Sequence, residues 1–266
     1  MKRLLSRITF KCVAWVLLLF LFLPVLVVIP VSLTDKTYLS LPTDGISLDH
    51  YRALLDPANG WTASFANSLV MAVTAATLAT GIATAFAVGA WMRSGWWPST
   101  VRIALLSPLI VPPIIYAVGM VRVLSRLHLL DTFLGVLAVH VILSLPMALL
   151  AVAASLSNLD ERMVRAARSL GARPMTIFGR VIVPNILPGM TAAAALSFIG
   201  SWDEITVTLF ITARRFVTLP RRIFTSIEDS IDPALAAITT VLLVLTILAL
   251  LARSLLKTRA AGPHSH

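Results

Sequence analysis

Six stretches of about 20 mostly apolar residues constrain the fold of this chain more than any other feature of its sequence. They lie at roughly 12–33, 67–92, 103–123, 132–156, 190–212 and 234–256. A helix of about 20 apolar residues crosses the hydrocarbon core of a bilayer, because each residue advances the helix by about 1.5 Å. The sequence therefore predicts an all-α integral membrane protein with six transmembrane helices, forming a single domain over residues 1–266.

The composition agrees with a membrane protein and argues against a nucleic-acid-binding one. Hydrophobic residues make up 58% of the chain, charged residues 13%, and the mean hydropathy is +0.90. A soluble domain carries about twice that charged fraction. The net charge of +10 would suggest nucleic acid in a soluble protein, but in a membrane protein basic residues gather in cytoplasmic loops. The single cysteine, Cys12, excludes an internal disulfide and a multi-cysteine metal site.

The N-terminal apolar stretch is predicted to remain as a membrane anchor. "MKRLLSR" has the basic character of a signal-peptide start, but about 20 apolar residues follow it without an A-x-A cleavage site. With the N-terminus inside, thirteen of the 22 Lys and Arg residues fall in inner segments and eight in outer ones. Basic residues favour the cytoplasmic side, so both termini are predicted to be cytoplasmic. The cluster "RRFVTLPRR" in the last outer loop runs against this bias.

Three of the apolar stretches carry residues that a uniform lipid-facing helix would not need. The stretch 67–92 has a row of small residues at helical spacing, which lets another helix approach closely: Gly81, Ala85 and Gly89. Three prolines must interrupt the backbone hydrogen bonds of 103–123: Pro108, Pro112 and Pro113. The stretch 132–156 contains His140, which we expect to be a neutral ring hydrogen-bonded to another helix.

The inner loop at 158–189 has too much pattern for a simple connector. Asp160 suits the N-cap of a short helix, and Gly171 stands where a helix C-terminal glycine would. Pro174 is tolerated in the first turn of a second helix, which Pro184 and Pro188 are predicted to end. The loop is therefore predicted to contain a short helix, a glycine turn and a second helix.

The pattern of this loop leaves two roles open. Val164, Ala167 and Leu170 recur at helical spacing, while arginines occupy another side of the same helix. Such a helix pair could protrude into a groove on a soluble partner. It could also lie on the membrane with its arginines on anionic lipid.

The stretch "RAARSLGARPMTIFGRVIVPNILPG" resembles the EAA loop of inner-membrane permeases of bacterial binding-protein-dependent ABC importers. That pattern has Glu-Ala-Ala, three residues, Gly, nine residues and an apolar-x-Leu-Pro ending. The positions that match it are Ala166, Ala167, Gly171, Val181 and Pro184. Arg165 stands where the family usually has Glu, and Val183 where it has Leu, so a carboxylate contact at position 165 is lost.

The resemblance covers essentially the whole chain, and "SWDEITVTLFITARRFVTLPRRIFTSIEDSIDPALAAITTVLLV" is similar to the second permease of the spermidine/putrescine-type pair. It implies the type I importer permease fold in the bacterial inner membrane, with 158–189 as the cytoplasmic coupling loop. It also implies a second permease subunit, two ATP-binding subunits that hold ATP and Mg, and a periplasmic solute-binding protein. The residues it implies for ATPase coupling are Arg165, Ala166, Ala167, Gly171, Ala172, Phe178 and Pro184.

The chain itself lacks the motifs of an ATPase or of the common enzymes. No G-x-x-x-x-G-K-[ST] phosphate loop, H-E-x-x-H or G-x-S-x-G occurs, so no catalytic residue, metal site or bound cofactor is predicted. Energy must then come from a partner or from an ion gradient. The alternatives to an importer permease are a secondary transporter or channel and, third, a membrane-embedded enzyme. The resemblance suggests a polyamine substrate, while related permeases carry amino-acid-like solutes, phosphonates or iron.

Two adjacent acids lie inside the fifth apolar stretch, in "FIGSWDEITVTLF". Each costs a few kcal/mol at a bilayer centre, so such residues usually mark a pathway or a helix contact. Asp203 and Glu204 point about 100° apart on a helix, unless Gly200–Ser201 loosens it and both face water. Trp202 could add a cation–π contact if it faces the same path. The predicted substrate-pathway residues are Ser201, Trp202, Asp203 and Glu204.

Overall fold

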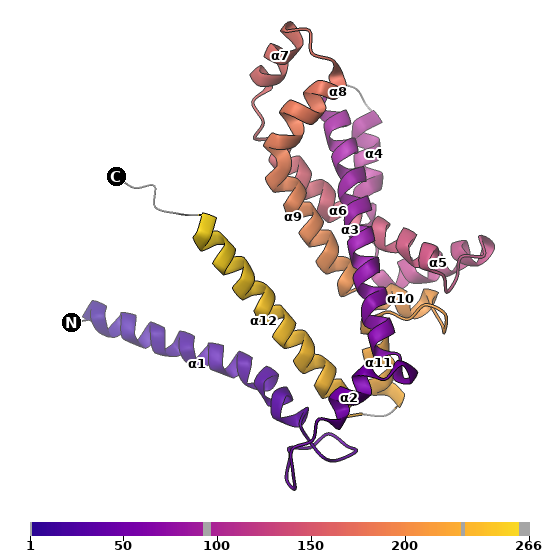
Figure 1. Cartoon of the computed structure of the whole chain (residues 1–266). Helices are drawn as coiled ribbons and strands as arrows, with labels where there is room; N and C mark the ends of the chain where they lie inside the picture. The colour runs from indigo at the N-terminus through magenta and orange to yellow at the C-terminus, as the bar shows by residue number, and fades with distance from the viewer. Residues whose placement is uncertain (1, 93–96, 230–231, 261–266) are drawn as a thin grey trace. The chain divides into compact units, whose positions relative to one another are not determined.

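The computed structural model describes residues 2–92, 97–229 and 232–260, and every regular element among them is helical (Figure 1). Five helical segments in these ranges are long and apolar enough to cross a membrane: Phe10–Val31, Trp61–Met92, Phe133–Leu156, Pro174–Trp202 and Ala234–Ala252. A bent pair, Pro98–Leu109 with Pro113–Arg126, makes a sixth if it is one span. The prediction of an all-α membrane protein is confirmed.

Contacts divide the chain into two compact units, Met1–Ala63 with Ile223–His266, and Ser64–Arg222. In the first unit, α1 (Lys2–Val31) packs against α12 (Ala234–Ala260), and α12 also packs against α2 (Asp49–Leu55). A single 3-10 turn, η1 (Pro57–Asn59), follows α2. The single permease domain over residues 1–266 stays a prediction.

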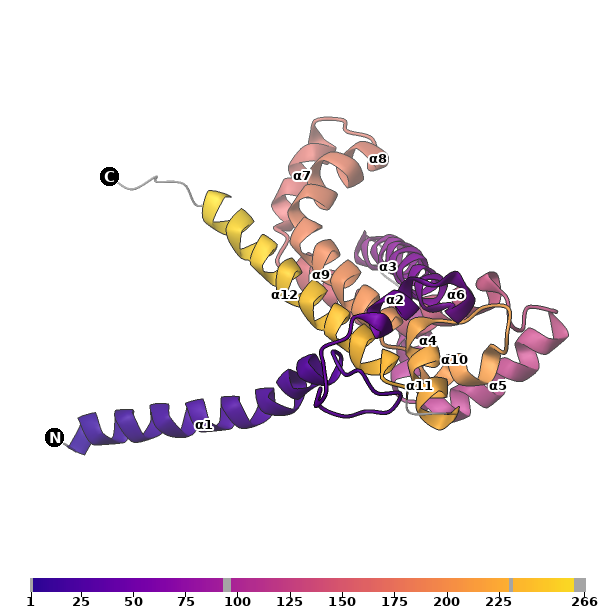
Figure 2. The same cartoon turned by 60° about the horizontal axis from the view of Figure 1, so that its bottom comes forward.

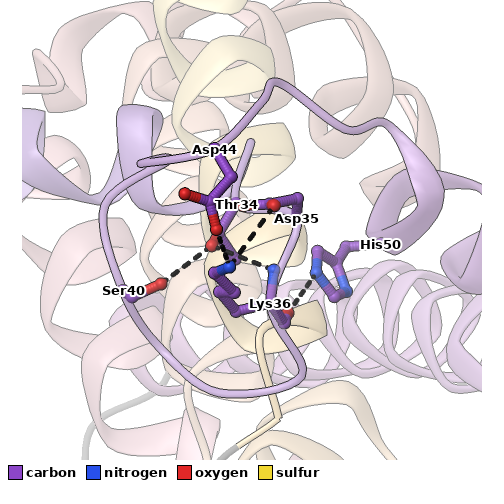
Figure 3. A network of polar contacts seen from close by, with 6 residues as sticks. All are labelled: Thr34, Asp35, Lys36, Ser40, Asp44 and His50. Carbon is purple, nitrogen blue, oxygen red and sulfur yellow. Dashed lines mark hydrogen bonds and ion pairs between the residues drawn. The ribbon is translucent and has the colours of Figure 1, made fainter.

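A polar network orders the loop that follows α1 (Figure 3). The Lys36 ammonium donates to Asp44 and lies 3.7 Å from a carboxylate oxygen of Asp35. The hydrogen bond to Asp44 raises the pKa of Lys36 above its usual value. The hydroxyls of Thr34 and Ser40 are 2.9 Å apart, and the Lys36 carbonyl lies 3.1 Å from Nε2 of His50 on α2. These contacts hold the loop against the start of α2.

The second unit is built around α3 (Trp61–Met92), α6 (Phe133–Leu156) and α9 (Val183–Trp202). The small residues that α3 buries in the core it shares with α6 and α9 include Ala75, Ala79, Ala83 and Ala87. The row that contains Gly81 and Gly89 lies elsewhere, and a Cβ added at either glycine meets nothing within 4 Å. Small residues thus occupy two sides of α3, and the alanine side packs inside this chain.

α6 and α9 approach each other closely at Gly189. A Cβ built at Gly189 on α9 would lie 2.2 Å from Cβ of Ser155 and 3.0 Å from the carbonyl oxygen of Ala151, both on α6. Real Cβ atoms do not come that near, so only glycine fits. The apolar core on this side includes Ala148 and Val152 of α6 and Ile186 of α9.

The three prolines of the third apolar stretch break its helix, as predicted. The segment contains α4 (Trp97–Leu106), the 3-10 turn η2 (Ser107–Leu109) and α5 (Pro113–Arg126). The two halves are bent by 108° at the break. Pro112 is the extended residue just before α5, at φ −55° and ψ 137°, and Pro113 opens the new helix, where a missing N–H costs nothing.

The prediction that Pro184 and Pro188 end the helix after Pro174 is wrong. A short helix α8 (Pro174–Ile177) leads through a π-helical turn (Phe178–Ile182) directly into α9, which contains both prolines. Pro184 falls in the first turn of α9, and the wide π turn before it accommodates the change of hydrogen-bond register. Packing of α9 along α6 outweighs the cost of Pro188 inside the helix.

The apolar stretch predicted at 190–212 is not one helix. α9 ends at Trp202, and a separate helix α10 (Thr206–Ile211) begins after three residues. α11 (Leu219–Asp229) follows the loop after α10. In Figures 1 and 2, α7 (Glu161–Ser169) and α8 lie at one end of the α6–α9 pair, and α5 and α10 lie toward the other.

Asp131, in the turn between α5 and α6, holds the loop after α10. Its carboxylate accepts four backbone N–H hydrogen bonds, from residues 213 to 216, at 2.8 to 3.1 Å. Its own N–H donates to the Ile211 carbonyl at 2.9 Å. Burial alone would raise the pKa of Asp131, but the four N–H donors stabilise its charged form and lower the pKa to about 2. The residue adopts a positive φ of 56°, which Asp tolerates better than most residues.

Candidate functional site

The two acids of "SWDE" lie where the backbone is not helical. The Asp203 N–H still donates to the Ile199 carbonyl at 3.0 Å, at the last turn of α9. The Glu204 carboxylate turns forward and accepts the Val207 N–H at 2.7 Å, which satisfies a first-turn donor of α10. The break therefore comes at residues 203–205, just after the predicted loosening at Gly200–Ser201.

Glu204 lines a cavity of about 290 Å³ inside the second unit. The cavity lies between α6, the end of α9 and the proline break before α5. Its polar side chains are His140, Ser144, Ser201 and Glu204. Its apolar lining includes Leu143, Met147, Leu196, Leu109 and Val111. One carboxylate, one imidazole and two hydroxyls thus face an otherwise apolar space.

The structure separates the four predicted pathway residues into two pairs. Ser201 and Glu204 line the cavity, whereas Trp202 and Asp203 are not among its lining residues. The Trp202 ring stacks on Phe198 at 5.9 Å and meets Phe65 edge-on at 5.6 Å. Asp203 is exposed on the surface of this chain. Neighbouring side chains point to different surroundings here because α9 ends at Trp202 and the backbone changes direction at residues 203–205.

His140 is 1% exposed and bonds to both helices that flank the break. Its Nδ1 lies 2.7 Å from the Ser201 hydroxyl on α9, and its Nε2 lies 3.1 Å from the Thr208 hydroxyl on α10. The prediction of a ring hydrogen-bonded to another helix is confirmed. Its place in the same cavity as Glu204 was not predicted, because its partners lie 61 and 68 residues away in the chain.

The loop at 158–189 has the local structure that its capping signals predict. The Asp160 carboxylate accepts the Arg162 N–H at 2.8 Å, which caps α7. Gly171 adopts a φ of 77° and ends the helix. Arg165 pairs with Glu161 one turn earlier, at 2.9 Å, on an exposed side of α7. A carboxylate is therefore present one turn before the position where the family usually has Glu.

The remaining loop residues divide between its attachment and its exposed surface. Val164 and Ile177 are buried in the core of the second unit, and Ala167, Ala172 and Phe178 pack against it. The predicted coupling residues that are exposed are Arg165, Ala166, Gly171 and Pro184. Leu170, expected on the apolar side with Val164, is 88% exposed, and Met175 is 77% exposed. The loop thus combines a firmly packed base with an apolar tip.

Broken membrane helices beside a protruding helical loop are typical of membrane transport proteins. The chain matches the family described as "Binding-protein-dependent transport system inner membrane component" over residues 78–261, and it belongs to that family. It is therefore a multi-pass inner-membrane protein and the permease subunit of an ABC importer. Importers of this family combine such subunits with ATPase and solute-binding subunits.

Its relatives include permeases that are named for different substrates. The chain is 28% identical to the spermidine/putrescine transport system permease protein PotC of Shigella flexneri, over 91% of this chain and 92% of that protein. It is 29% identical to PotC of Haemophilus influenzae, over 97% and 98%. It is also 34% identical to the Fe(3+)-transport system permease protein FbpB 2 of Haemophilus influenzae, over 52% of this chain and 28% of that protein.

Proposed function

We propose that this permease imports a polyamine or a similar small cationic amine, and that Glu204 contacts the substrate on its path. The observation that carries the proposal is the carboxylate of Glu204 at a helix break, lining a cavity of about 290 Å³. A carboxylate in an apolar membrane region is costly unless a positive charge or polar groups compensate it. A primary ammonium group supplies both a positive charge and three hydrogen-bond donors.

The rest of the cavity suits the rest of such a molecule. The Ser144 and Ser201 hydroxyls can accept hydrogen bonds from an ammonium group near Glu204. Leu143, Met147 and Leu196 offer apolar surface to a methylene chain. The likeness to PotC over nearly the whole chain supports the same substrate class. Iron, phosphonates and amino-acid-like solutes are the competing substrates.

The energy of transport comes from partners in this proposal. ATP and Mg bind two ATPase subunits, which receive the loop 158–189 through its exposed tip at Leu170 and Met175. Arg165, Ala166, Gly171 and Pro184 lie on the exposed surface of that loop, while Ala167, Ala172 and Phe178 anchor it. The second permease subunit completes the path, both termini are cytoplasmic, and a periplasmic solute-binding protein delivers the substrate.

The test compares Glu204→Gln with Asp203→Asn in the complete complex, reconstituted with saturating loaded binding protein. Each change neutralises one acid without altering its size. We expect Glu204→Gln to lower the amount of amine imported per ATP hydrolysed by about tenfold, the scale of one charge-assisted hydrogen bond. Asp203→Asn serves as the matched control and should stay within about twofold of the unmodified protein.

Four results would count against the proposal. Normal import by Glu204→Gln removes the pathway role of this residue. A parallel loss of ATP hydrolysis and import indicates a structural or gating role instead. Failure of the cognate binding protein to bind putrescine or spermidine in a calorimetric titration overturns the substrate class. Import driven by an ion gradient without ATP contradicts the ATP-coupled mechanism.

A further inference from the structure

His140 connects α6 to Glu204, within the helix break, through a series of hydrogen bonds whose donors and acceptors can be assigned. The Thr208 hydroxyl donates to the Glu204 carbonyl at 3.1 Å, so its proton is already used. Nε2 of His140, 3.1 Å from the same hydroxyl oxygen, must therefore be the donor in that contact. Nδ1 then carries the lone pair and accepts the Ser201 hydroxyl proton at 2.7 Å.

This series of hydrogen bonds runs from Ser201 to His140, from His140 to Thr208, and from Thr208 to the backbone carbonyl of Glu204. It starts on α9, passes through α6 and ends at the break before α10. The three residues at the break, 203–205, belong to neither helix, although the Asp203 N–H still bonds to Ile199 and the Ile205 carbonyl accepts the Leu209 N–H. Every bond of this series is at least partly removed from water, where hydrogen bonds hold geometry most strongly.

We infer that His140 is a positioning residue that fixes the direction of the Glu204 carboxylate by holding the backbone of the break through Thr208. The inference rests on the proposed role of Glu204 in the substrate path. Two attachments keep Glu204 in place: its own carboxylate bond to the Val207 N–H at 2.7 Å, and the Thr208 bond to its carbonyl. The first bond fixes the Glu204 side chain relative to α10. The second bond, through Thr208 and His140, fixes the Glu204 backbone and the start of α10 relative to α6.

This arrangement explains why a histidine occupies the position. The ring must accept on one side and donate on the other, toward hydroxyls on two different helices. The neutral imidazole offers one acceptor and one donor at different distances from the backbone of α6, whereas an Asn or Gln amide holds both at a single distance. A leucine of similar volume would fill the space but leave the Ser201 and Thr208 hydroxyls without this link.

Two amide variants of His140 each keep one of its two hydrogen bonds and remove the other. The Asn side chain of His140→Asn reaches the position of Nδ1 and keeps the link to Ser201, while the longer side chain of His140→Gln reaches that of Nε2 and keeps the link to Thr208. Because the Thr208 link leads to Glu204, we expect His140→Gln to retain most of the import per ATP hydrolysed. His140→Asn and Thr208→Val should lower it about three- to tenfold, and Ser201→Ala less.

A double-mutant cycle with Glu204→Gln separates positioning from general stability. If His140 acts through the Glu204 charge, His140→Asn should add no further loss in the Glu204→Gln background. Multiplicative losses, or a fall in thermal stability and ATP hydrolysis that matches the fall in import, would overturn the inference. A normal Glu204→Gln single variant would instead overturn the proposed pathway role, so the two failures are distinguishable.

Discussion

The Asp131 carboxylate is the point at which two distant loops of the second unit are joined, and its loss should be costly. Asp131→Asn is the informative change, because Asn tolerates the positive φ of 56° at this position as Asp does. In the structure, one carboxylate oxygen accepts the N–H groups of residues 213 and 216, and the other accepts those of 214 and 215. An amide can present an oxygen to only one of these pairs.

The size of the effect follows from this division. In Asp131→Asn, two of the four backbone N–H groups face an NH₂ group and lose their acceptor. The other two keep an acceptor oxygen, but that oxygen no longer carries a negative charge. Hydrogen bonds to a charged group contribute about 1.5–3 kcal/mol, against about 1 kcal/mol for neutral ones, and water compensates part of the loss at exposed residues. We expect a loss of about 2–4 kcal/mol in the free energy of unfolding, or roughly 4–16 °C in Tm at this chain length.

The same hydrogen bonds make the stability of the protein depend on pH in a defined direction. The pKa of Asp131 is lowered from 3.8 to about 2, so its stabilisation is fully present above about pH 4 and is lost as pH falls toward 2. The difference in Tm between the unmodified protein and Asp131→Asn should be constant from pH 5 to 8 and should shrink below pH 4.

Thermal unfolding of the purified protein in detergent, over a series of buffers, measures both quantities. Asp56→Asn is the control, because the Asp56 carboxylate accepts only one backbone N–H, that of Ala58 at 2.9 Å, and Asn caps as well as Asp. A Tm of Asp131→Asn within 1 °C of the unmodified protein, or a difference that changes between pH 6 and 7, would refute the reasoning.

Two further predictions concern glycines. Gly189→Ala places a Cβ 2.2 Å from that of Ser155 and should cost about 1–3 kcal/mol in thermal stability, whereas Gly81→Ala meets nothing within 4 Å and should be neutral or stabilising. Equal Tm values for the two variants would contradict the close contact of α6 and α9. The second prediction is that Gly171→Ala, which forces a side chain onto a φ of 77°, strains the backbone by about 1–2 kcal/mol. This variant should weaken ATPase docking without affecting membrane insertion. Gly179→Ala, in open space, is its control, and normal co-purification of the ATPase with Gly171→Ala would argue against the coupling role.

The features that could be predicted from the sequence are those determined within a few residues of chain. Asp160 caps α7 through the N–H two residues on, and Gly171 turns the chain at the end of the same helix. The apolar stretches likewise depend only on local composition. Even so, local rules failed at Pro184 and Pro188, because packing of α9 along α6 and a π-helical turn outweighed the helix-breaking tendency of proline.

Features that join distant segments could not be predicted. α3 has small residues on two sides, and periodicity alone does not show that Ala79 and Ala83 are buried while Gly81 is not. The partners of His140 are 61 and 68 residues away, and those of Asp131 are 82 to 85 residues away. Both residues could be recognised as unusual, but their partners depend on how the helices pack.

The adjacent acids show how one local break changes a prediction made from helical geometry. On a continuous helix, Asp203 and Glu204 would differ only by a rotation of about 100°. Because α9 stops at Trp202, the Glu204 backbone is instead held by the Thr208 hydroxyl, which in turn contacts His140, and Glu204 lines the cavity while Asp203 stays exposed. An acidic residue in a membrane segment can thus be found in the sequence, but the direction of its side chain is determined by residues on other helices.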